Sequence, residues 1–178
     1  MNEINDKGNK AKVCLRALEM EDLDFLYEVE NDRSLWGVGC TNVPYSRQML
    51  IDYIASASAD IYADRQMRLI IEDGRKETVG MIDLINFDPR HLRAEIGIVI
   101  KDEARGKGYA QEAIRQLLVY SKEILHLHQL YAIVSTKNEK ASNMLHSVGF
   151  EGSKILKEWL FEGDFYVDAY LFQYFLFN

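Results

Sequence analysis

The segment RGKGYA at residues 105–110 combines residue types that suggest a specific chemistry. A strand-like apolar run, residues 94–100, precedes it, and a helix-like run, residues 109–125, follows it. A glycine-rich turn at a helix N-terminus directs several free backbone N–H groups toward one point, where they and the helix dipole favour an anion. Its two glycines leave room for a phosphate, while Arg105 and Lys107 add positive charge. The segment is therefore predicted to bind a pyrophosphate.

Other phosphate-binding motifs fit this turn poorly. The string GxxxxGK[ST] of a P-loop does not occur in the chain. Gly106 and Gly108 match the start of a dinucleotide fingerprint, but Gln111 stands where that motif needs a third small residue. The alternative interpretation is an ordinary turn before a helix, which binds nothing.

Two carboxylates interrupt apolar strands and are candidates for acid–base chemistry. Asp83 lies within MIDLI and Glu95 within AEI. A carboxylate on the core side of a strand is costly, so each is expected to face a cleft or the surface. Strand alternation places Glu95 on the same face as Gly97 and Val99. Either carboxylate could accept a proton from an amine, and the alternative for each is a solvated strand face.

Three sequence blocks together resemble the GNAT N-acetyltransferases, over about residues 12–177. The pattern RGxGxA resembles the family's acetyl-CoA-binding segment, and NxxA at residues 138–141 with Gly149-Phe150 resembles its second block. LRxL at residues 15–18, followed by EDL at residues 21–23, is similar to its opening strand and first helix. The likeness is greatest to the branch that holds ribosomal-protein N-terminal and spermidine acetyltransferases.

The resemblance implies an enzyme that transfers acetyl from acetyl-CoA directly to an amine, without a metal ion. It places a backbone N–H near Val99 against the developing oxyanion, and Glu95 or Asp83 as the base. The residues it implies in cofactor binding are Ile98, Val99, Ile100, Arg105, Gly106, Lys107, Gly108, Tyr109, Ala110, Asn138 and Ala141.

One position departs from the family pattern. Many members carry a tyrosine four residues before the glycine of the Gly-Phe pair, where it protonates the departing thiolate, and this chain has Leu145 there. His146 follows, but one helical step turns it about 100° away. The departure keeps a second hypothesis open, in which the chain is an acyl-CoA-binding sensor with little or no transferase activity.

The remaining elements predict a single α/β domain. Strands are expected at residues 13–18, 67–72, 78–86, 93–100, 129–134, 150–159 and 165–177, and helices at residues 21–30, 46–57, 109–125 and 139–148. Thr136 or Asn138 is expected to cap the last helix, with Thr136 and Glu139 in a capping box. The helix between residues 94–100 and 129–134 makes those strands parallel. The expected fold is a mixed, mostly antiparallel sheet with a central parallel pair and about four helices.

Composition limits the setting and the partners. The chain has 178 residues and a net charge of −7, which argues against a nucleic-acid surface and agrees with a cationic acceptor. It has two cysteines, and its four histidines show no metal-ligand spacing. Residues 1–12 are expected to form a flexible tail before a domain at residues 13–178. We expect a cytoplasmic, membrane-independent protein, either monomeric or homo-oligomeric, that acts on a small amine, a polyamine or a protein N-terminus.

Overall fold

The computed structural model describes residues 11–35, 43–58 and 60–177. Most of the predicted tail and residues 36–42, between the first two predicted helices, lie outside these ranges. The strands are β1 (Val13–Ala17), β2 (Met67–Asp73), β3 (Thr78–Asp88), β4 (Arg93–Ile100), β5 (Gln129–Ser135), β6 (Glu151–Glu162) and β7 (Phe165–Phe175). The helices are α1 (Leu23–Asn31), α2 (Arg47–Ser56), α3 (Ile61–Asp64), α4 (Tyr109–Glu123) and α5 (Glu139–Ser147), with short 3-10 turns at Met20–Asp22 and Asp102–Ala104.

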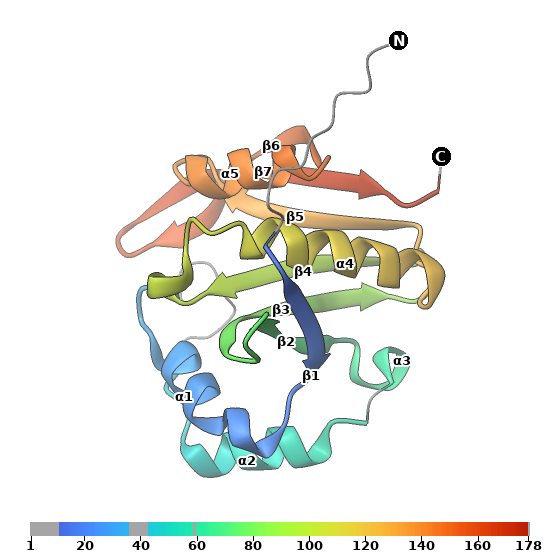
Figure 1. The fold of residues 1–178 in the computed structure, drawn as a ribbon. Coiled ribbons are helices and arrows are strands. Elements are labelled where there is room, and N and C mark those ends of the chain that lie inside the picture. The colour runs from blue at the N-terminus through green and yellow to red at the C-terminus, as the bar shows by residue number, and fades with distance from the viewer. Residues whose placement is uncertain (1–10, 36–42, 59, 178) are drawn as a thin grey trace.

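The strands form one seven-stranded sheet in the order β1-β2-β3-β4-β5-β7-β6 (Figure 1). Every neighbouring pair is antiparallel except β4 and β5, which are joined by the crossover through α4. The predicted central parallel pair is therefore confirmed. Its ladder is short, because it joins only residues 93–95 of β4 to residues 129–131 of β5. Beyond Glu95 no further pairing between these two strands is recorded in the described chain.

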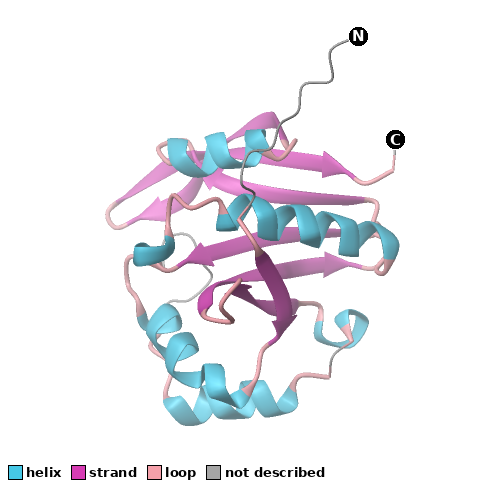
Figure 2. Ribbon diagram, in the orientation of Figure 1, coloured by secondary structure: helices cyan, strands magenta, loops and turns pink. Residues whose placement is uncertain are grey.

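Helices cover both faces of this sheet (Figure 2). On one face, α4 buries Ala113, Ile114 and Leu117 in the same cluster as Ile82 and Ile96 of the sheet. These residues lie at helical spacing and form one apolar stripe that faces the sheet.

The opposite face carries α1 and α2. Phe25 and Leu26 of α1 and Leu50 of α2 pack with Ile70 of β2 and Met81 of β3. Because alternate residues of a strand face opposite sides, Glu95, Gly97 and Val99 lie on the same side of the sheet as Met81 and Asp83. Both candidate carboxylates therefore belong to the α1–α2 face.

Two helical segments differ in detail from the sequence prediction. The sequence predicted about four helices, and the described chain has five α-helices, because residues 61–64 form the short α3, capped by the Asp60 side chain on the Tyr62 amide. The predicted helix at residues 21–30 begins as a 3-10 turn. Asp22 ends that turn, where Arg16 holds its carboxylate through two hydrogen bonds of 2.6 and 2.8 Å.

Gly80 lets β3 approach the end of β4, and replacing it should destabilise the fold. A Cβ at residue 80 would overlap the backbone carbonyl of Val99, which cannot move without bending β4. Gly80→Ala is therefore expected to lower the free energy of unfolding by about 1–3 kcal/mol, as measured by urea denaturation.

Gly97→Ala is the matched control for this substitution, because a Cβ there meets only the Asp83 Cβ at 3.9 Å, an ordinary contact. An equal loss of stability in the two variants would contradict the explanation.

Candidate active site

A cavity of about 1300 Å³ runs beside the open edge of β4. One end, the cofactor arm, is lined by the predicted turn, the start of α4 and the start of α5. The other end, the acceptor arm, is lined by α1, α2, α3, β2 and β3. The predicted site residues that line the cavity are Asp83, Ile98, Val99, Ile100, Arg105, Gly106, Gly108, Tyr109, Ala110, Asn138 and Ala141. Lys107 and Glu95 are not among the lining residues.

The turn before α4 has the geometry of an anion site. Gly106 and Gly108 have φ angles of +75° and +83°, in the left-handed region that favours glycine. Gly108 is the N-cap of α4, and no side chain caps the helix there. A Cβ at Gly106 would meet nothing within 4 Å, so the space above the turn is open. Free N–H groups facing open space fit a diphosphate well.

The two cations of this turn have different positions. Arg105 lines the cavity, donates to the Ile100 carbonyl at 3.1 Å and pairs with Asp102 at 2.7 Å. Lys107 is exposed and does not line the cavity. The pKa of Asp73 is lowered mainly by two backbone N–H donors, and the charge of Lys107 adds to this effect. Arg105 is thus the better placed of the two to contact an anion in the cavity.

The edge of β4 that faces away from β3 lines the cavity, and its recorded pairing with β5 in the described chain ends at Glu95. The Lys101 amide donates to β3 at the Val79 carbonyl, and the Val99 carbonyl also faces β3, against Gly80. Successive peptide groups of a strand point in opposite directions, so those of Ile98 and Ile100 point toward the side from which β5 has diverged. This alternation favours Ile98 or Ile100 over Val99 as the backbone donor to an oxyanion.

Asn138 both caps α5 and lines the cavity. Its side-chain Oδ1 accepts the Ala141 amide at 3.1 Å, so Asn138 is the N-cap and α5 begins at Glu139. The predicted capping box with Thr136 is wrong, since the Thr136 amide donates to the Asp168 carbonyl of β7 instead. Within the described chain, the Asn138 side-chain nitrogen has no recorded hydrogen bond, which leaves a donor for a ligand.

Glu95 lies at the point where β4 and β5 separate. It pairs with Ile85 of β3 on one side and with Tyr131 of β5 on the other. The Asn86 amide, on a residue that lines the cavity, donates to Glu95 Oε2 at 2.9 Å. Burial raises the pKa of Glu95, although hydrogen bonds from Asn86 and Tyr131 oppose the shift. A carboxylate with a raised pKa is a stronger base than a solvated one.

Asp83 is in a different state, because it is held by a buried cation. Arg68 Nε and Nη2 donate to its two carboxylate oxygens at 2.9 and 2.8 Å, and Arg68 Nη1 donates to Glu30 at 2.5 Å. Asp83 faces Gly97 across the β3–β4 ladder, on the same face of the sheet as Glu95, and unlike Glu95 it lines the cavity. Both of its oxygens are already engaged by Arg68, so of the two candidates Glu95 is the one with an oxygen that no cation holds.

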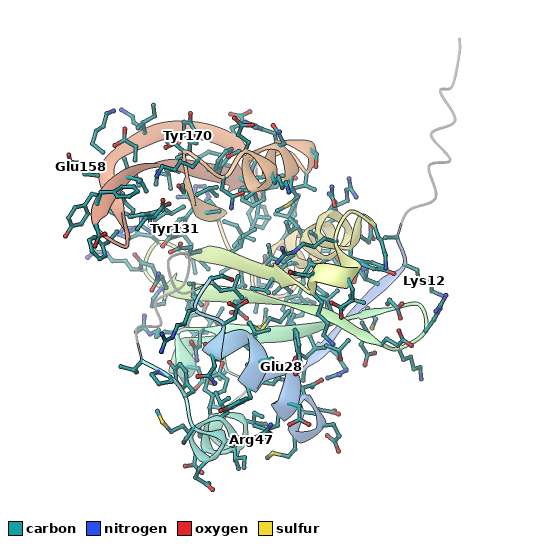
Figure 3. The ribbon with its side chains drawn as sticks, turned by 90° about the vertical axis from the view of Figure 1, so that its left-hand side faces the viewer. Lys12, Glu28, Arg47, Tyr131, Glu158 and Tyr170 are labelled. Carbon is teal, nitrogen blue, oxygen red and sulfur yellow. The ribbon has the colours of Figure 1, made fainter. Side chains whose placement is uncertain are left out.

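Leucine has no ionisable group, so residue 145 cannot supply a proton. The Leu145 side chain is buried in the core, and the His146 Nδ1 contacts the Phe150 carbonyl on the far side of α5 from the cavity. Tyr131 is the β5 partner of Glu95, and its phenol interacts electrostatically with that carboxylate. In Figure 3, Tyr131 lies between the β6–β7 hairpin and the region of α1 and α2. The label Glu158 marks the hairpin, Glu28 marks α1 and Arg47 marks α2.

Arg68 and Asn86 are the site residues that sequence reasoning missed. Arg68 pairs directly with Asp83 in the β2–β3 register, so the signal was an opposite-charge pair across a predicted hairpin. It could be found only by aligning the two strands residue by residue, and the bulge between Ile71 and Glu72 makes that alignment ambiguous in sequence.

The chain belongs to the GNAT acetyltransferases: the family model described as "Acetyltransferase (GNAT) domain" matches residues 12–151. The spermidine N(1)-acetyltransferase of Vibrio cholerae is 31% identical over 154 residues, covering 86% of this chain and 87% of that protein. The Escherichia coli enzyme of the same name is 31% identical over 156 residues, covering 86% and 81%. The predicted similarity to the spermidine branch is confirmed.

Solved structures agree with this assignment. The Vibrio cholerae enzyme in complex with CoA and spermine superimposes with a TM-score of 0.81 at 31% identity, covering 93% of this chain and 96% of that one. A dodecameric structure of the same enzyme gives 0.77 at 32% identity, covering 93% and 94%. Among the residues described here, no helix is long and apolar enough to span a membrane.

Substitution in the glycine turn tests the anion site. Gly106→Asp would place a negative charge where the diphosphate of CoA is expected, so affinity for CoA should fall at least tenfold, about 1.4 kcal/mol, in titration calorimetry. Gly163→Asp is the matched control. Gly163 has a φ of +72° and nothing within 4 Å of a Cβ, but it lies in the β6–β7 turn. Equal CoA affinity in both variants would remove the anion site.

Asn138→Ala separates ligand binding from helix capping. Loss of the cap should cost about 1 kcal/mol of stability, and loss of the free amide donor should also weaken CoA binding. Ser46→Ala removes the corresponding cap of α2, where the Ser46 hydroxyl accepts the Met49 amide at 3.2 Å. If Asn138→Ala, like Ser46→Ala, lowers the thermal midpoint without changing CoA affinity, Asn138 is a cap only.

Proposed function

We propose that this protein transfers an acetyl group from acetyl-CoA to a primary amine or α-amine by direct attack. The observation that supports this most strongly is the continuity of one cavity. It joins the glycine turn and the open edge of β4 to the space beside Gly97, which Asp83 lines, and Glu95 is hydrogen bonded to the lining residue Asn86. Such a cavity can hold a diphosphate-bearing cofactor at one end and an amine at the other, with the reacting groups between them.

Each part of the cavity has a role in this mechanism. The turn at residues 105–110 holds the diphosphate of acetyl-CoA, which supplies the reactive thioester. Asn138 and the peptide groups of Ile98 and Ile100 bind along the extended arm of the cofactor, and one of these N–H groups stabilises the oxyanion. The amine lies over Gly97 and gives its proton to Glu95, directly or through a water. No step needs a metal ion.

The departing group leaves without a dedicated acid. A thiol has a pKa near ~8.5, so its thiolate is a tolerable leaving group near neutral pH. Leu145 provides no proton, and solvent can protonate the thiolate after it departs.

The sensor hypothesis is the second candidate, and the absence of a tyrosine at Leu145 favours it. The two hypotheses agree on CoA binding and differ in turnover. Incubation with acetyl-CoA and a panel of amines, with free thiol as the readout, decides between them. CoA binding without release of thiol above the background rate for every amine would support the sensor.

The class of amine is not determined by the family assignment alone. The spermidine-acetylating relatives support a polyamine, whereas the sequence also allowed a small amine or a protein N-terminus. Homo-oligomerisation likewise remains a prediction; the dodecameric Vibrio cholerae relative supports it, and light scattering in solution would test it.

The pH dependence of turnover tests Glu95 as the base. Because the pKa of Glu95 is raised, kcat should fall with decreasing pH at values above those typical of a solvated glutamate. Glu95→Gln should abolish this acid limb and lower kcat by about 10²–10⁴-fold. Asn86→Ala removes a hydrogen bond that stabilises the charged carboxylate, so it should move the limb to higher pH. A limb that survives in Glu95→Gln assigns the base elsewhere.

The alkaline side of the same profile tests the missing acid. Without a side-chain acid, kcat should stay level at high pH. A decline at or above about pH 10 would instead identify a tyrosine, and Tyr131, whose pKa is raised by burial and by Glu95, would be the first candidate.

A further inference from the structure

Arg68 is a permanent cation inside the wall of the acceptor arm. Its guanidinium donates to both oxygens of Asp83, at 2.9 and 2.8 Å, and to Glu30 at 2.5 Å. Its side chain is 18% exposed, and those of Glu30 and Asp83 are each 14% exposed. All three line the cavity. A fixed cation therefore already engages the two carboxylates that an incoming ammonium group would find in this wall.

The surroundings hold this cation in place. The Tyr53 ring lies 5.6 Å from the Arg68 guanidinium carbon, on the side of α2. Burial alone would lower the pKa of Arg68, but Asp83, Tyr53 and Glu30 outweigh it, and the pKa stands above its usual range. Bidentate pairing with Asp83 also fixes the orientation of the guanidinium. The cluster is rigid and cannot be neutralised by losing a proton.

The rest of the acceptor arm offers little further negative charge. Its only other charged lining residues in the described chain are Asp64 and Arg65, which are exposed and of opposite sign. The Asp64 carboxylate also accepts the Ser58 amide at 2.9 Å. The uncharged lining residues of this arm are Val29, Ser34, Leu35, Tyr45, Leu50, Tyr53, Gln66, Met81, Ile85 and Asn86. Most of this surface is apolar or aromatic.

We propose that Arg68 is a specificity residue that, as the built-in counter-ion of Asp83 and Glu30, restricts the acceptor to amines that carry one positive charge on an apolar body. This inference rests on the proposed transferase function. The reacting amine loses its charge to Glu95, so it needs no lasting carboxylate partner. Each additional ammonium of a polyamine would need one, and would meet a wall whose paired carboxylates Arg68 occupies. A buried charge without a partner is strongly unfavourable.

A matched series of acceptors tests the inference directly. Butylamine, putrescine and spermidine share a four-carbon chain and carry one, two and three amino groups, each protonated near neutral pH. With acetyl-CoA saturating, kcat/KM of the wild-type protein should be at least tenfold higher for butylamine than for spermidine. A wild-type preference for spermidine would overturn the inference while leaving the transferase function intact. Absence of turnover with every amine, despite CoA binding, would instead refute the transferase function.

Substitution of Arg68 tests its causal role. Arg68→Gln leaves Asp83 and Glu30 without this cation, so the ratio of kcat/KM for spermidine to that for butylamine should rise at least tenfold. Arg65→Gln is the matched control, because Arg65 also lines the cavity but has no ion pair recorded in the described chain. This variant removes the same charge and should leave the ratio unchanged. An unchanged ratio in Arg68→Gln, or an equal rise in Arg65→Gln, would overturn the inference.

Two further variants keep the test decisive if Arg68→Gln does not fold. Arg68→Lys retains the charge but cannot pair with both carboxylates as a planar guanidinium does, so it should give an intermediate rise in the ratio. The double variant Arg68→Gln/Asp83→Asn removes both members of the main pair and should return the ratio toward the wild-type value. Failure of Arg68→Lys to change the ratio, or a high ratio in the double variant, would count against the inference.

Discussion

The separation of β4 from β5 is the constraint on which the rest of this structure depends. A strand in the centre of a sheet normally has both edges paired, because buried peptide groups need hydrogen-bond partners. Here the parallel ladder ends at Glu95 and Tyr131, and the remainder of β4 keeps only its β3 side. The N–H groups of Ile98 and Ile100 thereby point toward the cavity, while the Ile100 carbonyl accepts a hydrogen bond from Arg105. The cavity lies beside this opening, with the glycine turn at one end and Glu95 at the point where the two strands separate.

The two faces of the sheet carry different kinds of residue. On the α4 face, close packing of apolar residues fixes the long helix, and so fixes where its free N-terminus points. On the α1–α2 face, the sheet carries the charged residues Arg68, Asp83 and Glu95 beside the apolar contacts of α1 and α2. In the proposed mechanism, the α4 face supports the cofactor and the α1–α2 face provides the surface for the acceptor.

Asp83 and Glu95, the two carboxylates on the α1–α2 face, differ in their surroundings and therefore in their readiness to accept a proton. Asp83 is saturated by a guanidinium and acts as part of the wall. Glu95 has only neutral hydrogen-bond partners recorded and a pKa raised by burial, which suits it to take and release a proton. In sequence the two residues looked equivalent, since each is a single acid in an apolar strand.

The sequence alone determined the family, the strand and helix order, the parallel pair, the glycine turn and the loss of the tyrosine at position 145. These depend on local patterns, such as apolar periodicity and residues that permit a φ near +80°, and a linear chain displays such patterns directly. Only the tertiary structure decided that Asn138 caps α5, that Val99 faces β3, and that Arg68 binds Asp83 and Glu30. Those outcomes depend on strand register and on contacts between residues far apart in the chain. The 38 positions that separate Glu30 from Arg68 carry no local signal of such a contact.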